Sequence, residues 1–179
     1  MLKLLPCLLI CCVSLLLHPR LAHAQRSRDP LTAAEEEQVR EASDLPNDRV
    51  KLYIKFIEQR TEAIHATVRH PATQHPGADI HTSIEEYTRL LDELGDNLDA
   101  YDASHTDIRK SLHFLEEHIA KWPAALNEPA SSPEYDFARK TALDATETTT
   151  ADAKKLLKDQ EEYFAKHKQV KNEGTVKRE

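Results

Sequence analysis

The chain has 179 residues, of which 31 are acidic and 24 basic, so its formal net charge at pH 7 is −7. This acidity argues against a nucleic-acid-binding protein, which needs a basic surface to neutralise phosphates. All three cysteines, Cys7, Cys11 and Cys12, lie within the first 24 residues. If that segment is removed, the remaining chain excludes disulfides, thiolate nucleophiles and Cys-ligated metal centres.

Residues 1–24 have the pattern of a cleavable signal peptide. Lys3 gives a positive start, residues 4–17 are almost entirely apolar, and Ala22-His23-Ala24 is a small-x-small cleavage site before Gln25. The apolar run is shorter than the about 20 residues that a membrane-spanning helix needs. We therefore expect an exported protein, periplasmic or secreted, that is not integral to the membrane after cleavage. Lipid attachment at Cys11 or Cys12 is an alternative.

Helices are predicted in succession after the leader. Thr32 and Glu35 match a capping box and start a short helix that ends near Ala42. Apolar residues at steps of four and three then predict four long amphipathic helices, with Pro123 kinking or ending the third of them. The long segments span residues 46–69, 79–103, 104–126 and 133–166.

Each segment carries a stripe of residues expected to be buried, which we call its seam. The seam of the last segment has smaller side chains than the seams of the other three. We expect it to bury Tyr135, Ala138, Ala142, Ala145, Thr149, Asp152, Leu156 and Tyr163. Residues 167–179 are polar and are predicted to be a disordered tail.

Together these segments predict an all-α fold. With no competing strand pattern, residues 25–166 are expected to form a single domain, an up-down four-helix bundle with a short extra N-terminal helix. The strict seams suit either a monomer or a homodimer that shares a seam.

One short stretch resembles a known family. Residues 31–35, Leu-Thr-Ala-Ala-Glu, resemble the Leu-Thr-x-x-Gln motif of small periplasmic all-helical stress chaperones, which form dimeric cradles. Glu35 stands where that family has Gln, and the motif occurs once. The family is typically basic and rich in methionine, whereas this chain is acidic and its only methionine is Met1. A helix cap alone explains this likeness, so we do not assign the chain to that family.

Standard catalytic signatures are absent from the sequence. Its three glycines, at positions 77, 95 and 174, form no phosphate loop, dinucleotide fingerprint or nucleophile elbow. Glu62 and His65 have the Glu-x-x-His spacing of di-iron helical proteins, but those proteins need two copies and this chain has one. We expect a non-enzymatic protein, with a hydrolase or lyase built from Glu and His on facing helices as a remote alternative.

Two groups of residues are candidate sites. His70, His75 and His81 carry three imidazoles within a proline-punctuated segment, so they are candidate ligands for Zn²⁺, Cu²⁺ or Ni²⁺. The competing interpretation is a surface loop with solvated histidines. Trp122 and Leu126 could form a hydrophobic groove for a protein or peptide partner, or ordinary core. The favoured hypothesis is an exported protein that acts by protein or peptide interaction, and a metal-binding or buffering protein is the alternative.

Overall fold

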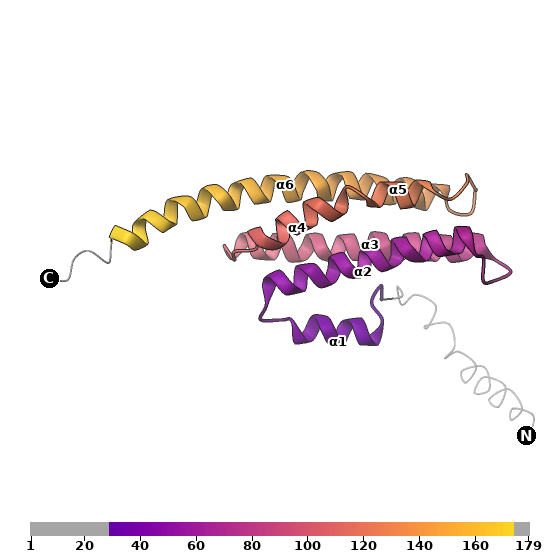
Figure 1. The fold of residues 1–179 in the computed structure, drawn as a ribbon, viewed down its shortest axis with the longest axis horizontal. Helices are drawn as coiled ribbons and strands as arrows, with labels where there is room; N and C mark the ends of the chain where they lie inside the picture. The colour runs from indigo at the N-terminus through magenta and orange to yellow at the C-terminus, as the bar shows by residue number, and fades with distance from the viewer. Residues whose placement is uncertain (1–28, 174–179) are drawn as a thin grey trace, which may run out of the picture.

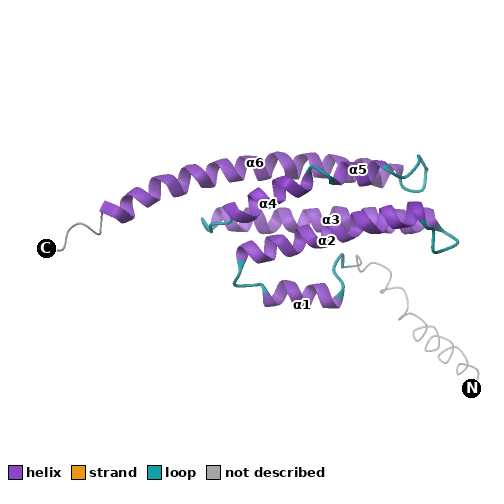
Figure 2. Cartoon of the chain, viewed as in Figure 1, coloured by secondary structure: helices purple, strands orange, loops and turns teal. Residues whose placement is uncertain are grey.

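The computed structural model describes residues 29–173, with side chains described through His167. Within that range the chain is all-α, as predicted, and contains no strand (Figures 1 and 2). The predicted cleavage residues Ala22, Ala24 and Gln25 lie outside it. The six described helices are α1 (Ala33–Glu41), α2 (Pro46–Arg69), α3 (Pro76–Ala103), α4 (Arg109–Ile119), α5 (Trp122–Asn127) and α6 (Asp136–Glu173).

The first helix, α1, is attached to the rest of the protein largely by charge. The predicted capping box is present: Glu35 N donates to the Thr32 hydroxyl, and the Thr32 N–H donates to the Glu35 carboxylate. The same carboxylate accepts hydrogen bonds from the Arg60 guanidinium of α2 at 2.7 and 2.9 Å, in a buried site. Arg60 also donates to the Pro30 carbonyl and lies 3.1 Å from a Glu86 oxygen of α3. One guanidinium therefore joins α1, α2 and α3.

This buried network shifts the pKa values of both partners. Burial alone would raise the pKa of Glu35, but the hydrogen bonds from Arg60 and Thr32 outweigh it and hold that pKa below its usual value. The hydrogen bond to Glu35 raises the pKa of Arg60 despite the burial of the guanidinium. The ion pair is therefore the stable form of this contact at neutral pH.

The most extensive contact in the fold is between α2 and α3. α2 begins and ends at the predicted residues, whereas α3 begins at Pro76, three residues before the predicted Asp79. Proline is well tolerated in a first helical turn, where its missing N–H would have no partner. The two helices contribute aliphatic and aromatic side chains that are almost fully buried: Val50, Ile54, Phe56, Ile57, Ile64, Ile84, Tyr87, Leu90, Leu91 and Leu94.

The third predicted long helix is divided into α4 and α5. α4 ends at Ile119 and α5 begins at Trp122, so the break lies before Pro123 rather than at it. In a continuous helix the Pro123 ring would clash with the carbonyl of Ile119, four residues earlier. This clash explains why α4 ends at Ile119. Pro123 itself lies in the first turn of α5.

The last helix, α6, packs on α3, α4 and α5 and extends past the ends of α3 and α4 (Figure 1). It continues to Glu173, beyond the predicted end at Lys166, and residues 174–179 of the predicted tail lie outside the described residues. Its predicted seam is confirmed at Tyr135, Ala142 and Leu156, which are buried, and is wrong at Asp152, which is exposed while the adjacent Ala153 is buried. A strict 3.5-residue repeat drifts by about 20° per heptad relative to a straight α-helix, and the drift accumulated between Tyr135 and Asp152 is enough to turn Asp152 off the buried face.

Two buried polar contacts fix α6 on its neighbours. The Tyr87 and Thr146 hydroxyls are 2.6 Å apart, which links α3 to α6. Gln160 accepts from the Ile108 N–H at 3.1 Å and donates to the Thr106 carbonyl at 2.9 Å, which links α6 to the segment before α4. None of the helices in the described part of the chain is long and apolar enough to cross a membrane.

Candidate functional site

A surface groove lies between the first halves of α3 and α6. It has a volume of about 310 Å³. Both helices start at the same end of the molecule, near the α2–α3 connection (Figure 1). The groove residues lie in the first halves of both helices. Its lining residues come from α3 (His81, Glu85, Thr88 and Arg89) and α6 (Phe137, Ala138 and Thr141), and we call this set the α3–α6 groove.

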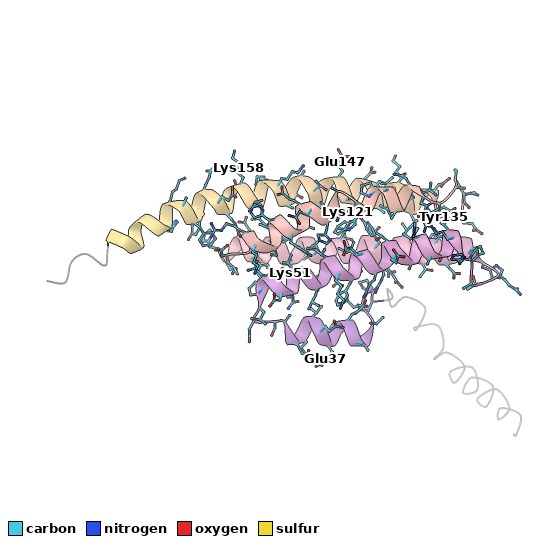
Figure 3. The ribbon with its side chains drawn as sticks, viewed as in Figure 1. Glu37, Lys51, Lys121, Tyr135, Glu147 and Lys158 are labelled. Carbon is cyan, nitrogen blue, oxygen red and sulfur yellow. The ribbon has the colours of Figure 1, made fainter. Side chains whose placement is uncertain are left out.

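Phe137 is the most unusual residue of the α3–α6 groove because it is 84% exposed. Leu45, at 54%, is the other exposed large hydrophobic residue within the described part of the chain. Two residues before Phe137, Tyr135 is buried, and its hydroxyl donates to the Ala130 carbonyl at 2.7 Å. Figure 3 shows Tyr135 at the start of α6. Because Tyr135 occupies the core side of this first turn, Phe137 points into solvent.

The α3 side of the groove is polar. His81 Nδ1 lies 2.5 Å from the Glu134 carbonyl oxygen, and His81 Nε2 lies 3.1 Å from a Glu85 carboxylate oxygen. The hydrogen bond to the Glu134 carbonyl, followed by that to Glu85, raises the pKa of His81. Since both ring nitrogens face acceptors, the geometry fits the protonated imidazolium. Arg89 donates to the Glu85 carbonyl at 3.3 Å. The rim therefore combines both signs of charge beside an apolar wall.

The three histidines predicted as metal ligands occupy different environments. His70 is the C-cap residue of α2 and His75 is the N-cap residue of α3, and both are exposed. His81, in contrast, contacts the Glu134 carbonyl oxygen in the α3–α6 groove. Among residues 29–173, no three His, Cys, Asp or Glu side chains are arranged so that they could hold a metal ion. The geometry thus gives the Zn²⁺, Cu²⁺ or Ni²⁺ hypothesis no support.

Trp122 and Leu126, for which a partner groove and ordinary core were the two interpretations, lie in the core. Trp122 is 2% exposed and Leu126 is fully buried. The Trp122 ring packs edge-on against Tyr87 of α3, with ring centroids 6.0 Å apart. Both side chains belong to the core because α5 turns them toward α2 and α6, so a partner could reach them only if the helices separated.

A second hollow contains the single Glu-x-x-His pair. It lies between α2 and α5, is lined by Glu62, His65, Lys121 and Glu128 among others, and has a volume of about 560 Å³. His65 Nδ1 contacts the Glu128 carboxylate. The neighbouring Thr61 hydroxyl donates to the Glu58 carbonyl at 2.8 Å and so is not directed at His65. The hollow offers an acid–base pair without an activated nucleophile, and a hydrolase or lyase activity stays a prediction.

Sequence reasoning missed Phe137, although a signal for it existed. Tyr135 and Phe137 are two residues apart, and a helix cannot direct both side chains to the same face. Assigning Tyr135 to the buried seam therefore leaves Phe137 exposed.

Comparison with known proteins identifies no family for this chain: no family model, no curated protein and no solved structure matches it.

Proposed function

We propose that this is an exported, non-enzymatic helical-bundle protein that acts by binding another protein or peptide at the α3–α6 groove. The observation that carries the proposal is the exposure of Phe137 beside that groove. Burying a phenylalanine side chain contributes about 1.5–3 kcal/mol, so a partner that covers Phe137 gains a large part of a binding free energy from one residue. Aromatic anchors next to a pocket are typical of interface hot spots.

The polar rim supports the same proposal. A partner that buries Phe137 also meets the polar side chains of His81, Glu85 and Arg89, which line the same groove. Interfaces commonly combine such an apolar centre with a polar rim. Because both walls of the groove are long helices, the anchor and the rim residues are held in fixed relative positions.

The proposed architecture is an up-down four-helix bundle made of α2, α3, the α4–α5 pair and α6, with α1 as the extra N-terminal helix. The contacts of α2 with α3, of α3 with α6 and of α4 with α6 support it. Successive long segments reverse direction in Figure 1, which is what short connections between packed helices favour.

Export rests on the signal-peptide pattern of residues 1–24. We expect the protein recovered from the periplasm or the medium to begin at Gln25. N-terminal sequencing and intact mass test this, and a protein that keeps Met1 or stays in the cytosol would contradict it.

The binding proposal is tested by site-specific photo-crosslinking in the native host. A benzoylphenylalanine at position 137 should give a defined crosslinked adduct, and Arg89→Ala in the same chain should lower its yield. The matched control places the same probe at position 45, the other exposed large hydrophobic residue described. No adduct at position 137, or equal adducts at both positions, would overturn the proposal.

A further inference from the structure

We propose that His81 makes binding at the α3–α6 groove dependent on pH, so that the groove binds its partner more tightly when the imidazole is protonated. This inference rests on the proposed function and names the regulation of the same site. It begins from the two acceptors that hold the ring: the Glu134 carbonyl oxygen lies 2.5 Å from Nδ1, and a Glu85 carboxylate oxygen lies 3.1 Å from Nε2. With a proton on each nitrogen, the ring has no lone pair for a metal ion.

A neutral imidazole cannot keep both contacts, because it carries one N–H. The acceptor at Nδ1 is a backbone carbonyl, and the carboxylate of the same residue, Glu134, lies against Gly77 in the first turn of α3. The acceptor at Nε2, in contrast, is the end of the Glu85 side chain, which is 54% exposed. We therefore expect the remaining proton to stay on Nδ1 and the Glu85 carboxylate to turn into solvent when His81 loses its charge.

Loss of this proton changes the charge of the groove. The charged groups that face His81 are Glu85 on α3 and Glu134 on the segment before α6. The α6 residues that line the groove, Phe137, Ala138 and Thr141, carry no charge. After deprotonation the α3 wall carries one more unit of negative charge, on a carboxylate that has lost its imidazolium. A partner that covers the groove must then remove that carboxylate from water, which is unfavourable.

The direction of the pH dependence follows from the same contacts. The hydrogen bond to the Glu134 carbonyl, followed by that to Glu85, raises the pKa of His81 above its ordinary value of 6.5. The imidazolium is therefore fully present below pH 6.5 and is lost as the pH rises through the raised value. We expect binding to weaken over that upper range.

The first test follows the His81 imidazole of the purified, ¹⁵N-labelled protein by NMR, and needs no partner. His81→Gln identifies the resonances of the ring by their loss. Both nitrogens should be protonated at about pH 5.5, and the single proton should lie on Nδ1 at about pH 8.5, on either side of the range in which imidazoles titrate. A neutral ring with its proton on Nε2 would show that the Glu134 contact breaks instead, and would overturn the inference.

The second test is photo-crosslinking from a benzoylphenylalanine at position 137, with the purified protein added to the exported proteins of the native host at the same two pH values. The adduct yield should be lower by about threefold or more at the higher pH, because an uncompensated carboxylate must then be desolvated. In His81→Gln the yield should be low at both pH values. In Glu85→Gln it should stay high at both, since no carboxylate is left to desolvate.

His113→Gln is the matched control, because each ring nitrogen of His113 also faces an acceptor, Glu116 at 3.9 Å and Glu161 at 3.8 Å. This variant should keep the pH dependence of the wild type. An adduct that forms equally at both pH values, or a pH dependence that survives His81→Gln, would overturn this inference and leave the proposed function standing. No adduct at either pH would overturn both.

Discussion

The contact of α1 with α2 differs in kind from the contact of α2 with α3. The α2–α3 contact is aliphatic, with residues such as Ile54, Ile57 and Leu91 removed from water on both sides. The α1 contact buries Val39 and Ala42, but its centre is the ion pair between Glu35 and Arg60. One helix is thus held by many non-directional contacts and the other by a few directional ones.

Because of this difference, the two contacts should respond differently to mutation. A packed aliphatic interface loses stability in proportion to the atoms removed, and the remaining residues stay in contact. A buried ion pair fails as a whole, since removing one partner leaves the other charged group without compensation. We therefore expect α1 to be released while α2 and α3 remain folded, and the following predictions test that separation.

The largest effect is expected in the core, at Trp122. Trp122→Ala removes a buried indole that packs on Tyr87 and should lower the free energy of unfolding by about 3–5 kcal/mol. Trp122→Phe should cost clearly less, because it keeps the ring contact and because the indole N–H finds no hydrogen-bond acceptor within the described residues. Equilibrium urea unfolding measures both. A Trp122→Ala protein as stable as wild type would show that α5 is not part of the core.

The next effect is expected at the α1 contact. Arg60→Ala breaks a buried pair, which typically costs about 3–5 kcal/mol. The measured loss of global stability should be smaller than for Trp122→Ala, because α1 can leave and return Glu35 to water. Hydrogen exchange should show lost protection in α1 with α2 and α3 still protected.

The control for this prediction replaces both charges. Arg60→Met with Glu35→Leu should recover much of the protection of α1, since well-packed apolar groups can substitute for a buried ion pair. A double variant that exchanges as fast as Arg60→Ala, or a single variant that unfolds α2 together with α1, would contradict the separation of the two contacts.

A pH titration probes the α1 contact without mutation. The pKa of Glu35 is lowered in the folded state from its ordinary value of 4.5. Its contribution to stability is therefore fully present above that value and is lost as the pH falls through the lowered folded-state pKa. We expect α1 to lose exchange protection below pH 4.5 before the α2–α3 core does. In the Glu35→Leu/Arg60→Met protein this acid-dependent step should disappear, and its persistence there would assign it to other groups.

The smallest expected effect is a gain in stability. Gly95 lies inside α3, and a Cβ built there meets no heavy atom within 4 Å. Gly95→Ala should therefore raise the free energy of unfolding by about 0.5–1 kcal/mol through helix propensity alone. Gly77→Ala is the comparison: its Cβ would meet the Glu134 carboxylate, which must move aside, so its gain should be smaller than that of Gly95→Ala. If Gly95→Ala destabilised α3, the helix would need a close approach there that the structure does not contain.

Local signals in the sequence predicted most helix positions. The capping box at Thr32 and the proline at position 46 mark starts that the structure has at the expected residues, whereas α3 begins at Pro76, three residues before its expected start. The break before Trp122 was harder to place because the steric effect of Pro123 acts on the carbonyl four residues earlier. The seam of α6 depends on tertiary contacts such as that between Tyr87 and Thr146, which no local pattern reports.

The candidate site was less accessible to sequence reasoning than the helices. The local sequence leaves Trp122 and Leu126 open between a partner groove and ordinary core, and their position in α5 buries both. His81 was grouped with His70 and His75 by spacing, whereas the fold directs it to Glu85 and the Glu134 carbonyl. The packing of α3 and α6 decides which aromatic residues are exposed, and the local sequence does not contain that packing.

The most direct test of the account is photo-crosslinking from position 137 in the native host. A benzoylphenylalanine there should give a defined adduct with a protein partner, and the same probe at position 45 should not, because Phe137 lines the α3–α6 groove and Leu45 does not. No adduct at position 137, or equal adducts at both positions, would contradict the claim that this groove binds a protein or peptide.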